Sequence, residues 1–324
     1  MIKINCPDSD RIANEYYKRL KAWLQCGTNK SKLGKPKKTT KHKTMLDFFE
    51  AHIQDIICNN YPDIKYWQSN FEKTYDIDIK NYKGTLNKHQ SKTKYGKFKK
   101  KMTSLFEDFM KAKGEDGKTN GVWLTQRLGI KTCPYCNRQY TFTIDKNATH
   151  MSIRPQLDHF LPKSKYPLLA LSFYNLIPAC PECNRIKRDE VLDIHPYNDD
   201  FDANGLKFKV GMRDESNQLV LKALNTSDFE IMITNGDKNK NVARLGLTEL
   251  YNEHKDYVAE IIWKCQAYNA GYYDTLIHTY KGLNLSNSEI HRIIWGAYID
   301  DGEQGRRPLS KLTKDIMEQL NMKL

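Results

Sequence analysis

Apolar side chains recur every three or four residues in the first part of the chain, which is the spacing of one helix face. The pattern predicts helices over residues 11–26 and 44–58, and two shorter ones over 102–113 and 121–129. The positions that define the first two are Ile12, Tyr16, Leu20, Trp23, Leu46, Phe49, Ile53, Ile56 and Ile57. We therefore expect a mostly helical N-terminal region.

The last part of the chain begins with an alternating pattern and then becomes helical. Apolar and polar residues alternate over 206–224, which predicts a β-hairpin. From Val242 to Ile262 the apolar positions form one amphipathic stripe, and further helices are expected over 288–299 and 309–320. The C-terminal region is therefore predicted to be a hairpin followed by helices.

Positive charge is confined to the first two fifths of the sequence. Residues 1–130 contain 27 lysines and arginines against 14 acidic residues, whereas residues 131–324 contain 25 of each, so the net charge of +13 arises entirely from the first segment. Two lysine-rich runs without acidic residues, 30–43 and 83–101, are expected to be loops between the helices. Such runs attract the phosphate backbone of nucleic acids; a solvated lysine loop without a ligand is the alternative.

Cysteine usage points to metal binding. Eight cysteines in 324 residues are too few for a disulfide scaffold, and four of them form two Cys-Pro-x-Cys pairs, Cys133/Cys136 and Cys180/Cys183. Two such pairs can close a tetrahedral zinc site, and four thiolates leave no position for a reactive water. We expect a structural zinc, a reducing compartment and, since no segment resembles a signal peptide or membrane helix, a cytoplasmic protein without a membrane partner.

Candidate catalytic residues lie between and beside the cysteine pairs. Asp158 and His159 are adjacent, and Asn184 directly follows the second pair. Phosphodiester hydrolysis needs a base to deprotonate water, a hard cation and oxygen ligands for that cation. His159 has the chemistry of the base, and Asp158 and Asn184 offer oxygen ligands. An isolated Asp-His pair is more often structural, so the argument depends on the zinc pairs that surround it.

The order of these motifs resembles the HNH, or ββα-metal, endonucleases that carry a zinc-knuckle brace. The resemblance covers about 60 residues, from the first cysteine pair through Asp158-His-Phe-Leu-Pro-Lys-Ser164 and Asn175-Leu-Ile to Cys180-Pro-Glu-Cys-Asn184 and Lys187. It implies a ββα core, with strands near 139–144 and 153–159 and a helix over about 181–189. The final His of the family name is replaced by Asn184, which suits Mg²⁺ better than a soft metal.

The resemblance also implies roles for individual residues. Asp158 and Asn184 would hold a catalytic Mg²⁺, with Mn²⁺ as the alternative, His159 would be the general base, and Asn175 would brace the loop that aims His159. Residues implied to contact the substrate backbone are Lys163, Lys165, Arg185, Lys187 and Arg188. His195, beyond the helix, is a further candidate for a metal or substrate contact, although a loop histidine before proline usually packs or caps.

Three short segments are similar to the HNH subunits of bacterial anti-phage defence systems, the PtuB-like subunits that work with an ATPase. They are Asp193–Tyr197, Arg244–Tyr251 and Arg307–Leu312. This second resemblance implies an antiviral role and an ATPase or other regulatory protein as partner.

Together these observations predict an α+β, predominantly helical protein with a central zinc-stapled ββα core. We expect a basic helical region over 1–125, the nuclease core over 126–205, and the hairpin and helices over 206–324. The expected function is a metal-dependent endonuclease acting on DNA. The alternatives are a nuclease acting on RNA, for example transfer RNA, and a non-catalytic zinc-stapled subunit that binds nucleic acid or a partner.

Overall fold

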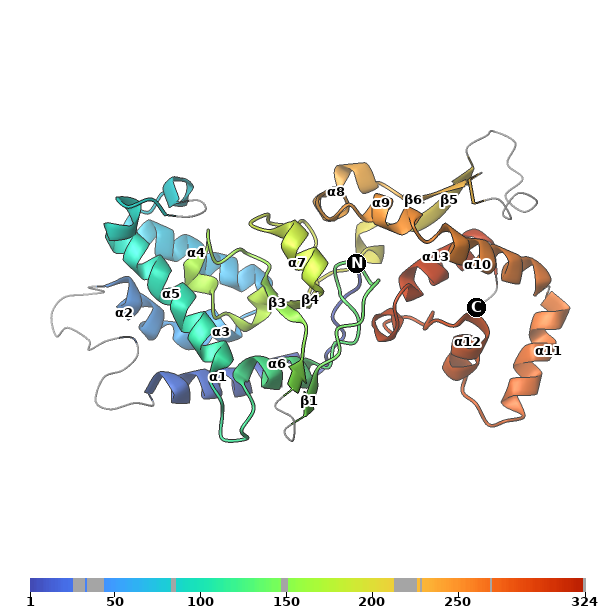
Figure 1. Cartoon of the computed structure of the whole chain (residues 1–324), viewed down its shortest axis with the longest axis horizontal. Helices are drawn as coiled ribbons and strands as arrows, with labels where there is room; N and C mark the ends of the chain where they lie inside the picture. Colours follow the sequence, from blue (N-terminus) through green and yellow to red (C-terminus); the bar gives the residue numbers. More distant parts are fainter. Residues whose placement is uncertain are drawn as a thin grey trace. The chain divides into compact units, whose positions relative to one another are not determined.

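The computed structural model describes residues 1–25, 33, 44–82, 86–146, 151–212, 226–227, 229–268 and 270–322. The described chain is α+β and mostly helical, and its strands form two-stranded sheets (Figure 1), which confirms the α+β, mostly helical class predicted from the sequence. It divides into two compact units. Unit 1 comprises Met1–Asn5, Ile130–Thr141 and Leu192–Leu324, and unit 2 comprises Cys6–Gly129 and Phe142–Val191. These units do not follow the three consecutive segments expected from the sequence.

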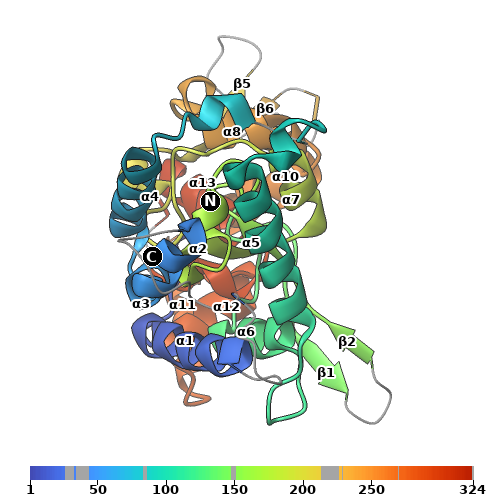
Figure 2. The same cartoon turned by 90° about the vertical axis from the view of Figure 1, so that its left-hand side faces the viewer.

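Unit 2 contains a group of helices (Figure 2), and aromatic side chains pack between them. Its helices are α1 (Ser9–Gln25), α2 (Met45–Ala51), α3 (Ile53–Cys58), α4 (Tyr61–Tyr75), α5 (Lys94–Lys111), α6 (Asn120–Leu128) and α7 (Pro181–Lys187). Tyr16 of α1 is fully buried, and its ring lies 5.5 Å from that of Phe109 on α5 and 6.0 Å from that of Phe173. The other apolar positions predicted for this helix are buried or half-buried as well, so its predicted apolar face packs into the core of the unit.

The helix predicted over 44–58 is broken at His52. The Thr44 side chain caps the N-terminus of α2 in a capping box with Asp47, and His52 ends α2 and begins α3 with a non-helical φ of −117°. The His52 ring lies 4.5 Å from the Trp67 ring of α4, between centroids. Helix α4 was not predicted from the apolar pattern.

The last part of the second lysine run is helical, so the prediction of a loop was wrong for residues 94–101. The Thr93 side chain caps α5 by accepting a hydrogen bond from the Gly96 amide. One face of the helix is apolar and buried, and it consists of Tyr95, Phe98, Met102, Leu105, Phe106 and Phe109. Helical spacing lets apolar and basic residues share the same segment on opposite faces. Lys99 is itself buried, and its ammonium donates to the Tyr82 carbonyl at 3.0 Å. The first lysine run, 30–43, lies outside the described residues, apart from Leu33.

Of the two strands predicted for the core, the second agrees with the structure and the first was placed incorrectly. Strand β3 (Gln156–His159) pairs in an antiparallel sense with β4 (Leu176–Ala179), with Asp158 opposite Ile177 and His159 opposite Leu176. Of the strand expected over 139–144, only the last residue is in a strand. That residue begins β1 (Ile144–Lys146), which pairs with β2 (Met151–Ile153) in a separate hairpin. Residues 131–141 fold back on themselves instead: the Cys133 amide donates to the Gln139 carbonyl at 2.9 Å. The predicted helix after the second cysteine pair is α7, which ends at Lys187.

Unit 1 holds a hairpin and the C-terminal helices. Strands β5 (Phe208–Met212) and β6 (Phe229–Ile233) pair in an antiparallel sense, and the second strand expected near Leu219 lies outside the described residues. The helices are α8 (Lys240–Leu245), α9 (Leu247–Asn252), α10 (Lys255–Ala267), α11 (Ala270–Lys281), α12 (Asn287–Trp295) and α13 (Ser310–Gln319). The single stripe predicted from Val242 is divided at Gly246, whose left-handed φ of +59° ends α8.

No helix in the described ranges is both long and apolar enough to cross a membrane.

Candidate active site and metal centre

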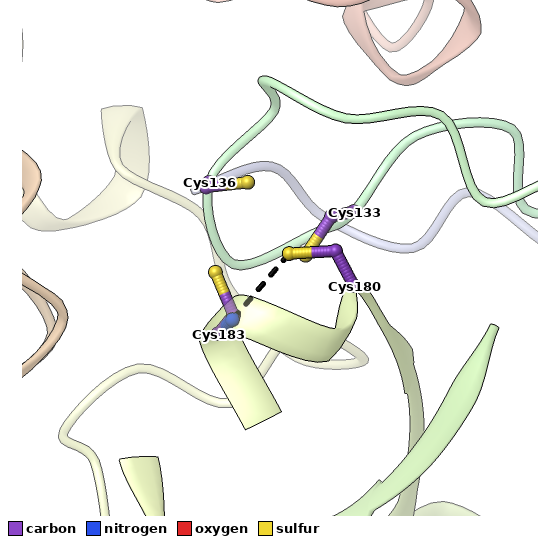
Figure 3. Close-up of side chains that lie close together, drawn as sticks. All are labelled: Cys133, Cys136, Cys180 and Cys183. Carbon is purple, nitrogen blue, oxygen red and sulfur yellow. Dashed lines mark hydrogen bonds between the residues drawn. The ribbon is translucent and has the colours of Figure 1, made fainter. Parts of the chain in front are cut away.

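The four cysteines predicted to bind zinc come together. Their sulfur atoms all lie within 4.8 Å of one another, and all four residues are buried (Figure 3). Cys180 is the N-cap of α7, and its sulfur accepts a hydrogen bond from the Cys183 amide at 3.5 Å. The Arg138 amide donates to the Cys136 sulfur at 3.4 Å. Amide donors of this kind favour the thiolate form that a metal requires.

The cluster has the right donors for a structural zinc ion. In a tetrahedral site with Zn–S bonds of about 2.3 Å, neighbouring sulfurs are about 3.8 Å apart. Sulfurs already within 4.8 Å need only a small adjustment to reach that geometry. The cluster can therefore hold a metal such as zinc, and its four thiolates would leave no ligand position for a catalytic water.

The candidate catalytic residues are assembled on β3, β4 and α7 within unit 2. Asp158 and His159 end β3, Asn175 directly precedes β4, and Asn184 and Lys187 lie on α7. Helix α7 follows β4 after only Cys180, and it contacts β3. The sequence therefore brings these five residues into one strand-strand-helix segment.

Asp158 forms a buried ion pair with Lys187. The Lys187 ammonium lies 3.2 Å from Asp158 Oδ1 and 3.1 Å from Oδ2, and it also donates to the His159 carbonyl at 2.7 Å. The Lys187 side chain is fully buried, and burial lowers its pKa, although the Asp158 charge opposes that shift. Lys187 was expected to face the substrate backbone. In the structure its ammonium lies inside the unit, against β3.

His159 is held as a neutral imidazole with a defined tautomer. Its Nε2 lies 2.9 Å from the Ala170 carbonyl oxygen. A carbonyl can only accept, so Nε2 carries the hydrogen and the lone pair is on Nδ1. Burial lowers the pKa of His159 to about 3, despite the opposing hydrogen bond to Ala170. The Phe106 ring of α5 packs edge-on against the imidazole, 4.4 Å between centroids.

Asn175 fastens the connection between β3 and β4. Its Oδ1 accepts from the Leu161 amide at 2.7 Å, and its Nδ2 donates to the carbonyls of Leu161 and Leu169, both at 3.0 Å. The residue is completely buried. Leu169 immediately precedes Ala170, so this side chain fixes the backbone next to the carbonyl that orients His159.

Asn184 lies at the surface end of the same segment. Its Nδ2 donates to Gln156 Oε1 at 2.6 Å. Both residues line a shallow pocket of about 250 Å³ together with Glu107 and Lys111 of α5 and Arg154. Gln156 and Phe106 were not identified from the sequence: Gln156 occupies an exposed strand position without any distinguishing pattern, and Phe106 is about 50 positions away from the motif.

The described arrangement does not by itself form a magnesium site. Both carboxylate oxygens of Asp158 are occupied by the Lys187 ammonium. Asn184 can offer its amide oxygen, but among the described residues the only group of three or more His, Cys, Asp or Glu ligands is the four-cysteine cluster. A divalent cation would have to compete with the Lys187 charge for Asp158.

The other expected substrate contacts occupy different settings. Arg185 and Arg188 are exposed on and after α7. Lys163 is paired with Glu107 at 3.0 Å, and the Lys165 ammonium donates to the Asp189 carbonyl. His195 is buried in unit 1, where its ring lies beside Tyr197 and its carbonyl accepts from the amides of Asn198 and Asp199.

The chain has limited similarity to known proteins. It is similar to Protein ea31 of Escherichia phage lambda, with 30% identity over 108 residues. The match covers 31% of this chain and 32% of the phage protein, so the chain spans about a third of that relative's length. No family model matches the sequence, and no solved structure matches it.

Loss of zinc should destabilise the protein. We expect wild-type protein to contain one tightly bound zinc, measured by inductively coupled plasma mass spectrometry, and Cys180→Ser to lose it. Structural zinc contributes on the order of 10 kcal/mol in small zinc units, so the variant should unfold at a much lower temperature. Cys265→Ser is the matched control, because Cys265 is a free thiol outside the cluster. Wild-type protein that contains no zinc and melts at the same temperature as Cys180→Ser would contradict the zinc assignment.

Removal of the Asn175 side chain should loosen the loop that holds His159. Asn175→Ala leaves two carbonyls and one amide without their partner, and we expect it to lower the free energy of unfolding by about 3 kcal/mol. Urea denaturation followed by tryptophan fluorescence measures this loss. Asn184→Ala is the control, because Asn184 is half-exposed and its hydrogen bond joins two surface side chains. Equal effects of the two substitutions would show that Asn175 has no special structural role.

Loss of one partner of the buried ion pair should lower the free energy of unfolding more than loss of both partners. Lys187→Met leaves the Asp158 carboxylate buried without its partner and should destabilise the protein by about 3–5 kcal/mol. The double variant Lys187→Met/Asp158→Leu removes both charges and should recover most of that loss. A double-mutant cycle by chemical denaturation gives the coupling energy; strictly additive effects would argue that the pair does not act as a unit.

Proposed function

We propose that this protein is a ββα-type nuclease that hydrolyses phosphodiester bonds of nucleic acid, with DNA as the preferred target. The observation that carries the proposal is the arrangement of His159. Its imidazole is neutral, its Nε2 is hydrogen-bonded to the Ala170 carbonyl, and its remaining lone pair is on Nδ1. This is the form of histidine that can accept a proton from water. The resemblance of the surrounding motifs to HNH endonucleases supports the same role.

The chain's own residues supply the base and its support. His159 Nδ1 would take a proton from water, and the resulting hydroxide would attack phosphorus and break its bond to the 3′-oxygen. The 3′-oxygen would take up a proton from solvent water, leaving a 5′-phosphate and a 3′-hydroxyl. Asn175 would hold the loop that positions the imidazole, while Arg185 and Arg188, both exposed, would contact the backbone phosphates. An anionic phosphate beside the imidazole raises its pKa, which would offset the lowering that burial causes in the free protein.

A divalent cation, when bound, would neutralise charge that develops on the phosphate oxygens. Asp158 and Asn184 are the residues that we propose to hold it, with Mg²⁺ or Mn²⁺ as the ion. Because Lys187 occupies the Asp158 carboxylate in the free protein, metal binding and the position of Lys187 should be linked.

A second function is favoured by two other observations. The ion pair neutralises Asp158, and burial lowers the pKa of His159 to about 3, well below the range of an effective base at neutral pH. These features fit a non-catalytic, zinc-stapled subunit that binds nucleic acid or a protein. An RNA-directed nuclease is the alternative within the catalytic class, because backbone chemistry at this site does not distinguish deoxyribose from ribose.

The proposed antiviral role rests on the three short segments that resemble PtuB-like subunits. Under this proposal an ATPase or another regulatory protein would control the nuclease, since an uncontrolled nuclease would damage its own cell. Co-purification of the partner by a tagged full-length chain, and activation of cleavage when the partner is added, would support this role.

Cleavage assays distinguish these functions. Purified protein is incubated with supercoiled plasmid and with a pool of small RNAs, in Mg²⁺, in Mn²⁺ and in EDTA, beside His159→Ala. We expect metal-dependent nicking or linearisation of the plasmid, with His159→Ala slower by about 10²–10⁴-fold. Cleavage of RNA alone would favour the RNA-directed alternative. Binding of nucleic acid without cleavage under every cation would favour the non-catalytic subunit. Circular dichroism spectra and melting temperatures of the wild type and His159→Ala control for a loss of folding in the variant.

A further inference from the structure

A second pocket in unit 2 is formed by the start of α2, the end of α4 and the first half of α5. Its volume is about 470 Å³, which lies in the range of pockets that bind small organic groups. Met45, Leu46 and Phe98 give it an apolar lining, and Thr44 and Tyr75 complete the wall. None of these residues belongs to the candidate active site.

The aromatic part of this pocket is rigidly supported. The Phe98 ring packs 5.0 Å from Phe71, whose ring lies 5.1 Å from that of Tyr75. The Tyr75 hydroxyl donates to the Thr44 carbonyl at 3.0 Å. Phe71 and Phe98 are buried, so the floor of the pocket is a preformed aromatic cluster.

Three lysines border the pocket from one face of α5. Lys94, Lys97 and Lys101 are spaced at i, i+3 and i+7, which places them along the same side of the helix. No carboxylate lines the pocket, and no described acidic side chain forms an ion pair with any of these three ammonium groups. An apolar, aromatic cavity is therefore combined with a row of positive charge.

We propose that this pocket binds an unpaired nucleobase of a nucleic-acid strand, while Lys94, Lys97 and Lys101 bind the phosphates on either side of it. Proteins that bind single strands use this combination of a basic track and an apolar or aromatic surface for the bases. An acidic amphipathic peptide is the competing occupant. A nucleic acid fits better because the lysines form a line along the helix, as successive phosphates do, and because the apolar lining lies beside that line of positive charge.

Helix α5 connects this pocket to the candidate active site. Phe106, on the same helix, packs against the His159 imidazole, and Glu107 pairs with Lys163 beyond β3. At 1.5 Å per residue, Lys101 and Phe106 are separated by about 8 Å along the helix axis. Resting on the proposed function, we infer that the strand held by α5 is the substrate, and that the substrate contains an unpaired nucleotide near the cleaved bond.

The test is a set of binding measurements by fluorescence anisotropy on the full chain. The probes are a labelled single-stranded DNA oligonucleotide, the same oligonucleotide with abasic residues, and the corresponding duplex. We expect the abasic strand to bind about tenfold more weakly than the intact strand although its phosphates are retained, because base stacking is lost. Equal affinity for the intact strand, the abasic strand and the duplex would overturn the proposal.

Substitutions at the pocket locate the effect. Leu46→Trp fills the cavity without changing its charge, whereas Leu46→Ala leaves it open; Leu46 is half-exposed, so both variants should fold. We expect Leu46→Trp to remove the preference for the intact strand over the abasic one and Leu46→Ala to retain it. Retention of the preference by both variants would place the base elsewhere and overturn the proposal.

A matched pair of lysine variants tests the phosphate contacts. Lys97→Ala should weaken binding and reduce the salt dependence of log K by about 0.7, whereas Lys100→Ala, on the same helix but outside the pocket, should have a smaller effect. Equal effects of the two substitutions on affinity and on its salt dependence would overturn the assignment of the phosphate contacts to the face of α5 that borders the pocket. If a labelled acidic peptide binds and the unlabelled oligonucleotide does not displace it, the pocket is a peptide site instead, and the proposal is overturned.

These binding assays and the cleavage assays can fail separately. Base-dependent binding without cleavage would leave the pocket assignment intact and favour the non-catalytic subunit over the nuclease. Cleavage of duplex DNA with no preference for an intact single strand would keep the nuclease and reject the pocket assignment.

Discussion

The buried ion pair between Lys187 and Asp158 sets the conditions for the rest of the candidate site. Two charged groups without access to water are tolerated only when they satisfy one another and their remaining hydrogen bonds. Lys187 meets this requirement by contacting both Asp158 oxygens and the His159 carbonyl, which fastens α7 to the end of β3. The orientation of the catalytic candidates therefore depends on a lysine that the sequence suggested would point to the substrate.

This ion pair also defines what activation would require. In the free protein the negative charge of Asp158 is already balanced, and the imidazole beside it is too deeply buried to be protonated at neutral pH. Arrival of a phosphate and a divalent cation would add one negative and two positive charges to this region. The charge balance among Asp158, His159 and Lys187 would then change as a unit.

The sequence identified chemistry better than it identified geometry. The spacing of Cys133, Cys136, Cys180 and Cys183 was sufficient to predict a cluster, because four thiolates in two short turns have few other uses. The strand that pairs with β3 was misplaced, since residues 139–144 are rich in the aromatic and β-branched side chains typical of strands and residues 176–179 form a short apolar run, and only backbone hydrogen bonds decide between them. Burial of Lys187 could not be predicted either, because a lysine at the end of a short helix has the same sequence signature whether it faces solvent or a carboxylate.

Helix α5 illustrates how one segment can carry two properties that sequence analysis tends to separate. Its charge suggested a loop, yet its apolar residues occupy every third or fourth position and pack into the core of unit 2. Because the two patterns have the same period, the helix can bury Phe106 against His159 while it presents Lys94, Lys97 and Lys101 beside the second pocket. A bound nucleic-acid strand would thereby be held by the same helix that packs against His159, the proposed general base.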